Sequence, residues 1–242
     1  MIVRMDSAFS AGKSFNQQIA GRDCHIYEQE MPLCILVQPL GVHEQDTLDA
    51  EVQSIAAKAS IPFAMVAFEI SDWERDLMPW SDPAVSKLSD AECHADETLR
   101  YITDELLPWL KGRFGDLPIV LGGYSLAGLF SLWAARECDC FYGIAAASPS
   151  VWIEGWPDYV DTHPMRARRV FLSLGEREEK TRNRAIARVG ERIRDEHALL
   201  QRQLGEANCT LEWNPGGHFV DCDSRLARAF IWNLARDEKQ DI

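Results

Sequence analysis

The stretch Leu121-Gly122-Gly123-Tyr124-Ser125-Leu126-Ala127-Gly128 decides the fold, because it places a serine between a strand and a helix. A short apolar run at residues 118–121 precedes it, and residues 126–137 are small or apolar nearly all round, as in a buried helix. A serine in such a sharp turn is strained, so Gly123 and Ala127 must be small where strand and helix approach each other. This pattern predicts a nucleophile elbow with the serine at its tip. The alternative is a tight turn whose serine only caps the helix.

Helical and strand patterns alternate to the end of the chain, which predicts an α/β fold with a mostly parallel sheet covered by helices on both faces. Strand patterns lie at residues 33–37, 63–70, 118–121, 141–147, 169–174 and 209–213, and residues 24–28 are expected to pair with the first as an edge strand. Helical patterns lie at residues 96–114, 126–137, 182–204 and 221–235, and Asp46 is expected to cap another helix. Pro108 should bend or restart the helix at 96–114. A single domain, 1–242, is expected, with residues 1–23 as a loosely packed N-terminal segment.

Composition and charge argue against several partners. Asp and Glu number 38 against 25 Lys and Arg, and the net charge of −13 has the wrong sign for binding nucleic acid. The first residues contain no apolar run long enough for a signal peptide or a membrane span, so a cytoplasmic protein without a membrane partner is expected. The seven cysteines lack C-x-x-C spacing, so no metal or cofactor is expected. Cys138 and Cys140, the close pair, are expected to be ordinary thiols in a reducing cytosol.

A nucleophilic serine needs a base to take its proton at neutral pH, and histidine is the usual base. His218 lies in the glycine-rich segment Asn214-Pro215-Gly216-Gly217-His218-Phe219, directly after the strand predicted at 209–213. A loop held by a rigid strand can carry this histidine to a neighbouring strand end. His218 is therefore predicted as the general base for Ser125.

A carboxylate should orient the histidine, and in this kind of fold it falls between serine and histidine in the sequence. The strand at 169–174 runs into Gly175-Glu176-Arg177-Glu178-Glu179-Lys180. Glu178 is preferred because the strand must turn at Gly175 and the reach then matches the third residue after it. Glu176 and Glu179 remain alternatives.

The oxyanion of an acyl-transfer intermediate needs backbone N–H donors. Leu126 supplies one, because its amide lies at the positive end of the helix that follows the serine. The second normally comes from the loop after an earlier strand, here Gln38-Pro39-Leu40-Gly41. Pro39 has no N–H, so Leu40 is preferred, while Gln38 and Gly41 would satisfy the same argument.

These segments resemble the esterase D and enterochelin-esterase group of the α/β-hydrolase superfamily. The similarity covers about residue 24 to the end and rests on residues 122–128, 147–152, 173–178 and 216–219, and on Trp73-Glu74-Arg75-Asp76-Leu77-Met78-Pro79-Trp80. The resemblance implies an α/β-hydrolase fold without a large lid, and it places Ser125, Glu178 and His218 in the triad positions. The chain departs from the group's pattern at Ala127 in place of glycine, at a glutamate where many relatives have aspartate, and at residues 38–41, where many have Asp-Gly.

The expected function is hydrolysis of a small-molecule carboxylic ester through an acyl-enzyme, without metal or cofactor. Trp73, Arg75, Trp80 and Trp152 come from segments expected at the carboxyl edge of the sheet, where ligands bind, although tryptophans also serve as plain packing. Arg75 could contact an anionic substrate or pair with Asp76 or Glu74. The choice of ester over thioester or peptide rests on the resemblance. The alternatives are a hydrolase-fold protein that binds a ligand without catalysis and a thioesterase or peptidase with the same triad, and the sequence predicts no oligomeric state.

Overall fold

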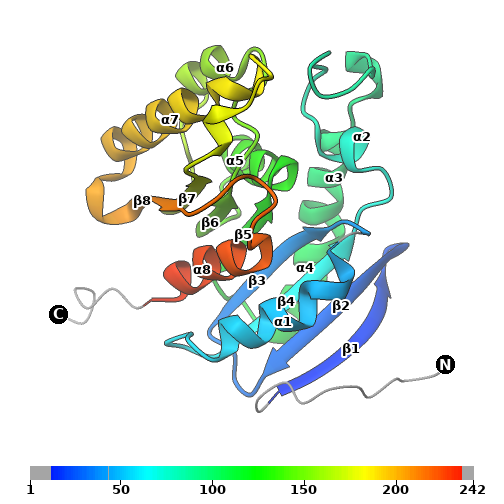
Figure 1. The fold of residues 1–242 in the computed structure, drawn as a ribbon. Coiled ribbons are helices and arrows are strands. Elements are labelled where there is room, and N and C mark those ends of the chain that lie inside the picture. Colours follow the sequence, from blue (N-terminus) through cyan, green and yellow to red (C-terminus); the bar gives the residue numbers. More distant parts are fainter. Residues whose placement is uncertain (1–11, 43, 236–242) are drawn as a thin grey trace.

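Eight strands form one sheet in the order β1-β2-β4-β3-β5-β6-β7-β8 in the computed structural model, which describes residues 12–42 and 44–235 (Figure 1). β3 to β8 run parallel, whereas β2 is antiparallel to β1 and to β4. The strands are β1 (Gly12–Ile19), β2 (Arg22–Gln29), β3 (Cys34–Leu40), β4 (Phe63–Glu69), β5 (Ile119–Tyr124), β6 (Gly143–Ala147), β7 (Arg169–Gly175) and β8 (Cys209–Asn214). The predicted α/β fold with a mostly parallel sheet is confirmed.

Two expectations about the N-terminal part were wrong. The strand expected at residues 24–28 pairs with β1 and β4 instead of β3, so it is an inner strand of the sheet. Residues 12–23, expected to be loosely packed, form β1 and the start of β2, because the turn at Ala20-Gly21 lets the chain fold back as a hairpin. Residues 1–11 lie outside the described part of the chain.

Helices cover both faces of the sheet (Figure 1). α1 (Gln45–Ala56) and α8 (Cys222–Leu234) pack on one face, where their apolar side chains join one core cluster with those of the strands. α3 (Ala95–Tyr101), α4 (Leu107–Phe114), α5 (Leu126–Glu137) and α7 (Val189–Leu204) pack on the other face. Two short helices, α2 (Trp73–Leu77) and α6 (Trp156–Thr162), contribute to this second core cluster. The apolar side chains of these helices therefore belong to the two core clusters, one on each face of the sheet.

Two helix boundaries differ from the sequence expectation for local reasons. Glu44, not Asp46, is the N-cap residue of α1. The restart expected at Pro108 is confirmed: residues 95–114 divide into α3, a π-helical turn at Ile102–Leu106 and α4, because Pro108 lacks an N–H and is tolerated only in a first turn. α7 starts at Val189 instead of residue 182. The Asn183 side chain accepts a hydrogen bond from the amide N–H of Ala185, which favours a turn there over a helix.

The expectation of ordinary thiols at Cys138 and Cys140 was also wrong, because the structure joins them in a disulfide. Cys138 ends α5 in an extended conformation, and the chain then places the two Cα atoms 5.5 Å apart, within the range that a disulfide spans. This pair therefore no longer supports the expected reducing compartment. In the part of the chain that the structure describes, no helix is long and apolar enough to cross a membrane.

Candidate active site

The turn between β5 and α5 has the geometry of a nucleophile elbow. Ser125 has φ of 57°, in the region that most side chains avoid. A Cβ on Gly123 would lie 2.5 Å from Cβ of Ala127, so this position accepts only glycine. The same crowding explains why residue 127 must be small, and alanine fits. Strand and helix therefore meet closely enough to hold the serine hydroxyl at the tip of the turn.

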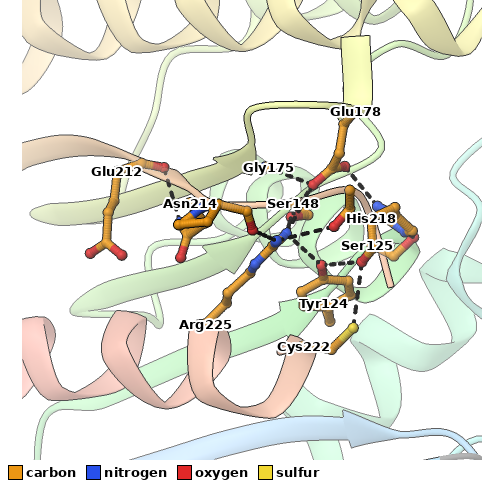
Figure 2. Close-up of polar contacts among 12 residues, drawn as sticks. Tyr124, Ser125, Ser148, Gly175, Glu178, Glu212, Asn214, His218, Cys222 and Arg225 are labelled. Atoms are coloured by element: carbon orange, nitrogen blue, oxygen red, sulfur yellow. Dashed lines mark hydrogen bonds and ion pairs between the residues drawn. The ribbon is translucent and has the colours of Figure 1, made fainter. Parts of the chain in front are cut away.

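Three side chains from three separate loops meet at this tip (Figure 2). His218 Nε2 lies 2.9 Å from Ser125 Oγ, and His218 Nδ1 lies 2.7 Å from Glu178 Oε2. The histidine follows β8 and the glutamate follows β7, so neighbouring parallel strands carry both to the same edge of the sheet. The structure therefore brings together the serine, histidine and acid predicted from the sequence.

Glu178 is buried, with 7% of its surface exposed, and its carboxylate is fully engaged. Oε1 accepts hydrogen bonds from the Gly175 amide at 2.7 Å, from Ser148 Oγ at 2.8 Å and from Arg225 Nη1 at 3.1 Å. Burial raises the pKa of Glu178, but the hydrogen bond and charge of His218, with the other donors, outweigh it and hold the pKa below its usual value. Of the two alternatives, Glu176 is exposed and Glu179 pairs with Arg194.

Of the two backbone N–H groups predicted to bind the oxyanion, the structure supports only that of Leu126. The Leu126 amide is the first of α5, and the first N–H groups of a helix have no partner within it. Leu40 is fully buried at the end of β3 and does not line the cavity beside Ser125, whereas Gly41 does. The Gly41 N–H donates to Glu44 Oε2 at 2.9 Å. The Gly41 N–H, which borders the cavity, is therefore already hydrogen-bonded to Glu44 and is not free to bind an oxyanion.

Two cavities adjoin the Ser125–His218 pair. The larger, of about 670 Å³, is lined by Gly41, Glu44, Trp73, Tyr124, Asp221 and Asp223 together with the pair itself. The smaller, of about 340 Å³, includes Ser150, Trp152, Arg177 and Ile186. Phe219 lines both cavities and has 90% of its surface exposed. An ester bound at Ser125 therefore has room for one substituent in each cavity.

The four residues predicted to bind substrate separate into two groups. Trp73 and Trp152 line the larger and the smaller cavity respectively. Arg75 pairs with Asp76 at 3.0 Å, and Trp80 packs on Trp156 and Tyr159 while its indole donates to the Glu154 carbonyl. Neither Arg75 nor Trp80 lines either cavity. No three His, Cys, Asp or Glu side chains within residues 12–42 and 44–235 are grouped as metal ligands would be.

The sequence analysis missed several residues around the triad. Tyr124 Oη donates to the His218 carbonyl at 2.5 Å, and Ser148 holds Glu178. Arg225 is a charged residue on the apolar stripe of α8, next to Leu226 and four residues before Ala229. A charge in such a stripe indicates a buried ion pair, and this signal could have revealed Arg225.

Comparisons with known proteins place this geometry in a family. The model of the family described as "Putative esterase" matches residues 27–220. An IroE-like serine hydrolase from Shewanella oneidensis is similar in structure, with a TM-score of 0.72, 15% identity and coverage of 93% of this chain and 82% of that one. The siderophore hydrolases EstB and EstA from Aspergillus nidulans have TM-scores of 0.68 and 0.63, identities of 15% and 17%, and coverage of 93% and 96% of this chain and 95% and 99% of theirs.

None of the curated proteins matches the chain in sequence. The structural likeness, at such low identity, supports the α/β-hydrolase fold, and the family model supports the activity. Because that model matches most of its length, the chain belongs to this esterase family and is a carboxylic ester hydrolase.

Proposed function

We propose that the chain hydrolyses a small-molecule carboxylic ester through an acyl-enzyme formed on Ser125. Ser125 Oγ attacks the ester carbonyl while His218 Nε2 takes its proton, and Glu178 stabilises the resulting imidazolium. The tetrahedral intermediate collapses, and the alcohol leaves with the proton from His218. Water then attacks the acyl-enzyme, again giving its proton to His218, and the acid and the free serine are released.

The observation that carries this proposal is the continuous hydrogen-bond chain from Ser125 Oγ through His218 to Glu178 Oε2. Both distances are in the range for direct proton transfer and orientation. The lowered pKa of Glu178 supports it further, because the acid must stay ionised to hold the imidazole in one tautomer. The cavity walls support an ester with an apolar or aromatic substituent, since Trp73, Trp152 and Phe219 line the space next to Ser125. The similar structures include two siderophore hydrolases and a serine hydrolase, which agrees with a small-molecule substrate.

Labelling with a fluorophosphonate probe tests the proposal, because only an activated serine reacts. We expect one adduct by intact mass on the native chain and none on Ser125→Ala or His218→Ala. Ser150→Ala is a matched control, since Ser150 Oγ lies 3.5 Å from Ser125 Oγ while the ring nitrogens of His218 bond to Ser125 and Glu178, and this variant should keep the adduct. No adduct on the folded native chain would refute the proposal.

One observation favours a second function, ligand binding by a hydrolase fold without catalysis. The Gly41 amide next to the cavity already donates to Glu44, and above about pH 7, where Glu44 loses its proton, the carboxylate would repel a developing oxyanion. The same labelling experiment separates the two functions. A ligand-binding protein would bind a slowly hydrolysed ester with no probe adduct at Ser125.

A further inference from the structure

Arg225 connects Glu178, the acid of the site, to residues 215–218, the loop that carries His218 and is called the histidine loop below. Its guanidinium is 1% exposed and extends from α8 to the end of the sheet (Figure 2). Nη1 donates to Glu178 Oε1 at 3.1 Å, and it also lies 3.2 Å from Tyr124 Oη and 3.4 Å from Ser148 Oγ. Nη2 donates to the carbonyls of Pro215 at 2.9 Å and Gly217 at 3.0 Å. One side chain therefore holds both the acid and the backbone that carries His218.

Packing alone would not select an arginine here. Its neighbours on α8, Leu226, Ala229 and Phe230, are buried and apolar, and placing a cation among them costs free energy unless it is paired and hydrogen-bonded. The planar guanidinium meets both conditions because it can donate in several fixed directions. The groups that accept its hydrogen bonds belong to Glu178 and to the histidine loop. Contacts at the active site therefore offset the free-energy cost of burying the guanidinium.

The contacts also set which carboxylate oxygen faces the histidine. Arg225, Ser148 and the Gly175 amide all donate to Oε1 of Glu178, which leaves Oε2 for His218 Nδ1. Without the guanidinium, the carboxylate has fewer contacts that fix its rotation. Such fixed orientation of a catalytic group is worth orders of magnitude in rate.

The charge of Arg225 has a second effect. The negative charge of Glu178 stabilises the imidazolium form of His218. The positive charge of Arg225, which pairs with Glu178, partly cancels this stabilisation. Tyr124 from β5 and Cys222 from α8 also face this pair, and the Cys222 thiol donates to the His218 carbonyl. Burial raises the pKa of both groups, so both are neutral near neutral pH. The charge of Asp223, the next residue along α8, raises the pKa of Cys222, whereas the charge of Arg225 lowers it. Charged groups that share a cavity with His218 are Glu44, Asp221 and Asp223 in the larger one and Arg177 in the smaller one.

We propose that Arg225 is a positioning residue for ester hydrolysis, which fixes Glu178 against His218 and restrains the basicity of the imidazole. This inference rests on the proposed triad. It assigns to α8 a part in the reaction beyond covering the sheet. The guanidinium does not contact Ser125 or either cavity and acts only through the acid and the histidine loop.

The test compares Arg225→Met and Arg225→Lys with the native chain, using a nitrophenyl ester and a pH series. For Arg225→Met we expect kcat to fall about 10²-fold with little change in KM, because the reacting groups lose their alignment. The acid limb of the kcat/KM profile should move to higher pH by about one unit, because the offsetting charge is gone. Arg225→Lys keeps the charge, so its acid limb should stay near the native position while kcat remains reduced.

Arg136→Met is the matched control. Arg136 is also 1% exposed and pairs with the buried Glu196, but it lies on α5 away from the triad. This variant should lose stability and keep the native acid limb. A native kcat and acid limb in folded Arg225→Met would overturn the proposal, as would an equal shift of the limb in Arg136→Met.

A measurement without turnover separates this inference from the proposed function. The ring signal of His218 is titrated by NMR in Ser125→Ala, with arginine, lysine or methionine at position 225. The titration midpoint should move to higher pH with methionine and stay in place with lysine. If the native chain has no esterase activity but the titration midpoint of His218 moves as expected, the proposed ester hydrolysis is refuted and the proposed role of Arg225 is supported. If methionine leaves the midpoint unmoved, the role of Arg225 fails whatever the activity.

Discussion

Replacing Glu44 by glutamine should stabilise the protein, and the gain should grow with pH. The Glu44 side chain is held beside Gly41 next to the cavity, and burial raises its pKa from 4.5 to about 7 despite the Gly41 hydrogen bond. The folded state therefore holds a proton that the unfolded chain gives up. The native protein loses stability as pH rises from the unfolded value through the folded one, and the loss levels off above it. Glutamine accepts the same Gly41 hydrogen bond and does not ionise.

The magnitude follows from the two pKa values. At about pH 5 the ionisation penalty on the native fold is about 1 kcal/mol, and at about pH 8 it reaches about 3 kcal/mol. Glu44→Gln should therefore gain about 2 kcal/mol relative to the native chain between these pH values. Urea unfolding at both pH values measures this difference directly.

Asp46→Asn provides the control. Asp46 is exposed in the first turn of the same helix, so its loss removes one negative charge without removing a buried one. Its effect on the free energy of unfolding should be nearly the same at both pH values. If Glu44→Gln also shows the same effect at both, Glu44 is not held in its neutral form by burial and the reasoning is wrong.

Three further predictions test the site. Both tryptophans pack against the core, so Trp73→Ala and Trp80→Ala should both lower the melting temperature. Only Trp73→Ala should also raise KM several-fold, because only Trp73 lines a cavity. Thermal unfolding and steady-state kinetics measure the two effects. Gly123→Ala should lower kcat at least about 10²-fold, since its Cβ would collide with Ala127 and displace the elbow, and a native kcat would exclude this crowding. Among esters with one leaving group, assayed at about pH 8 where Glu44 is ionised, those with a carboxylate in the larger cavity should have a lower kcat/KM than neutral isosteres. Glu44→Gln should narrow this difference in kcat/KM.

The core of the site could be predicted because its signals are local. The small residues Gly123 and Ala127 lie within two positions of Ser125, so the elbow can be recognised from a short stretch of sequence. The glycines before His218 likewise indicate a loop after a strand. The choice of Glu178 used only the expected reach from Gly175, and the structure brings this residue to the histidine. The order of β2 and β4 was not predictable in the same way, because strand pairing depends on contacts distant in sequence.

What the sequence could not give is the state of each carboxylate near the serine. Glu44 and Glu178 are the same residue type, and each follows the end of a parallel strand. Glu178 receives three donors on one oxygen and a histidine on the other, and these keep it ionised. Glu44 receives one backbone amide and is partly buried, and the resulting desolvation raises its pKa. Different environments thus shift the pKa values of two glutamates near one nucleophile in opposite directions, and they depend on donors from Arg225, Ser148 and Gly41, which only the folded chain brings into place.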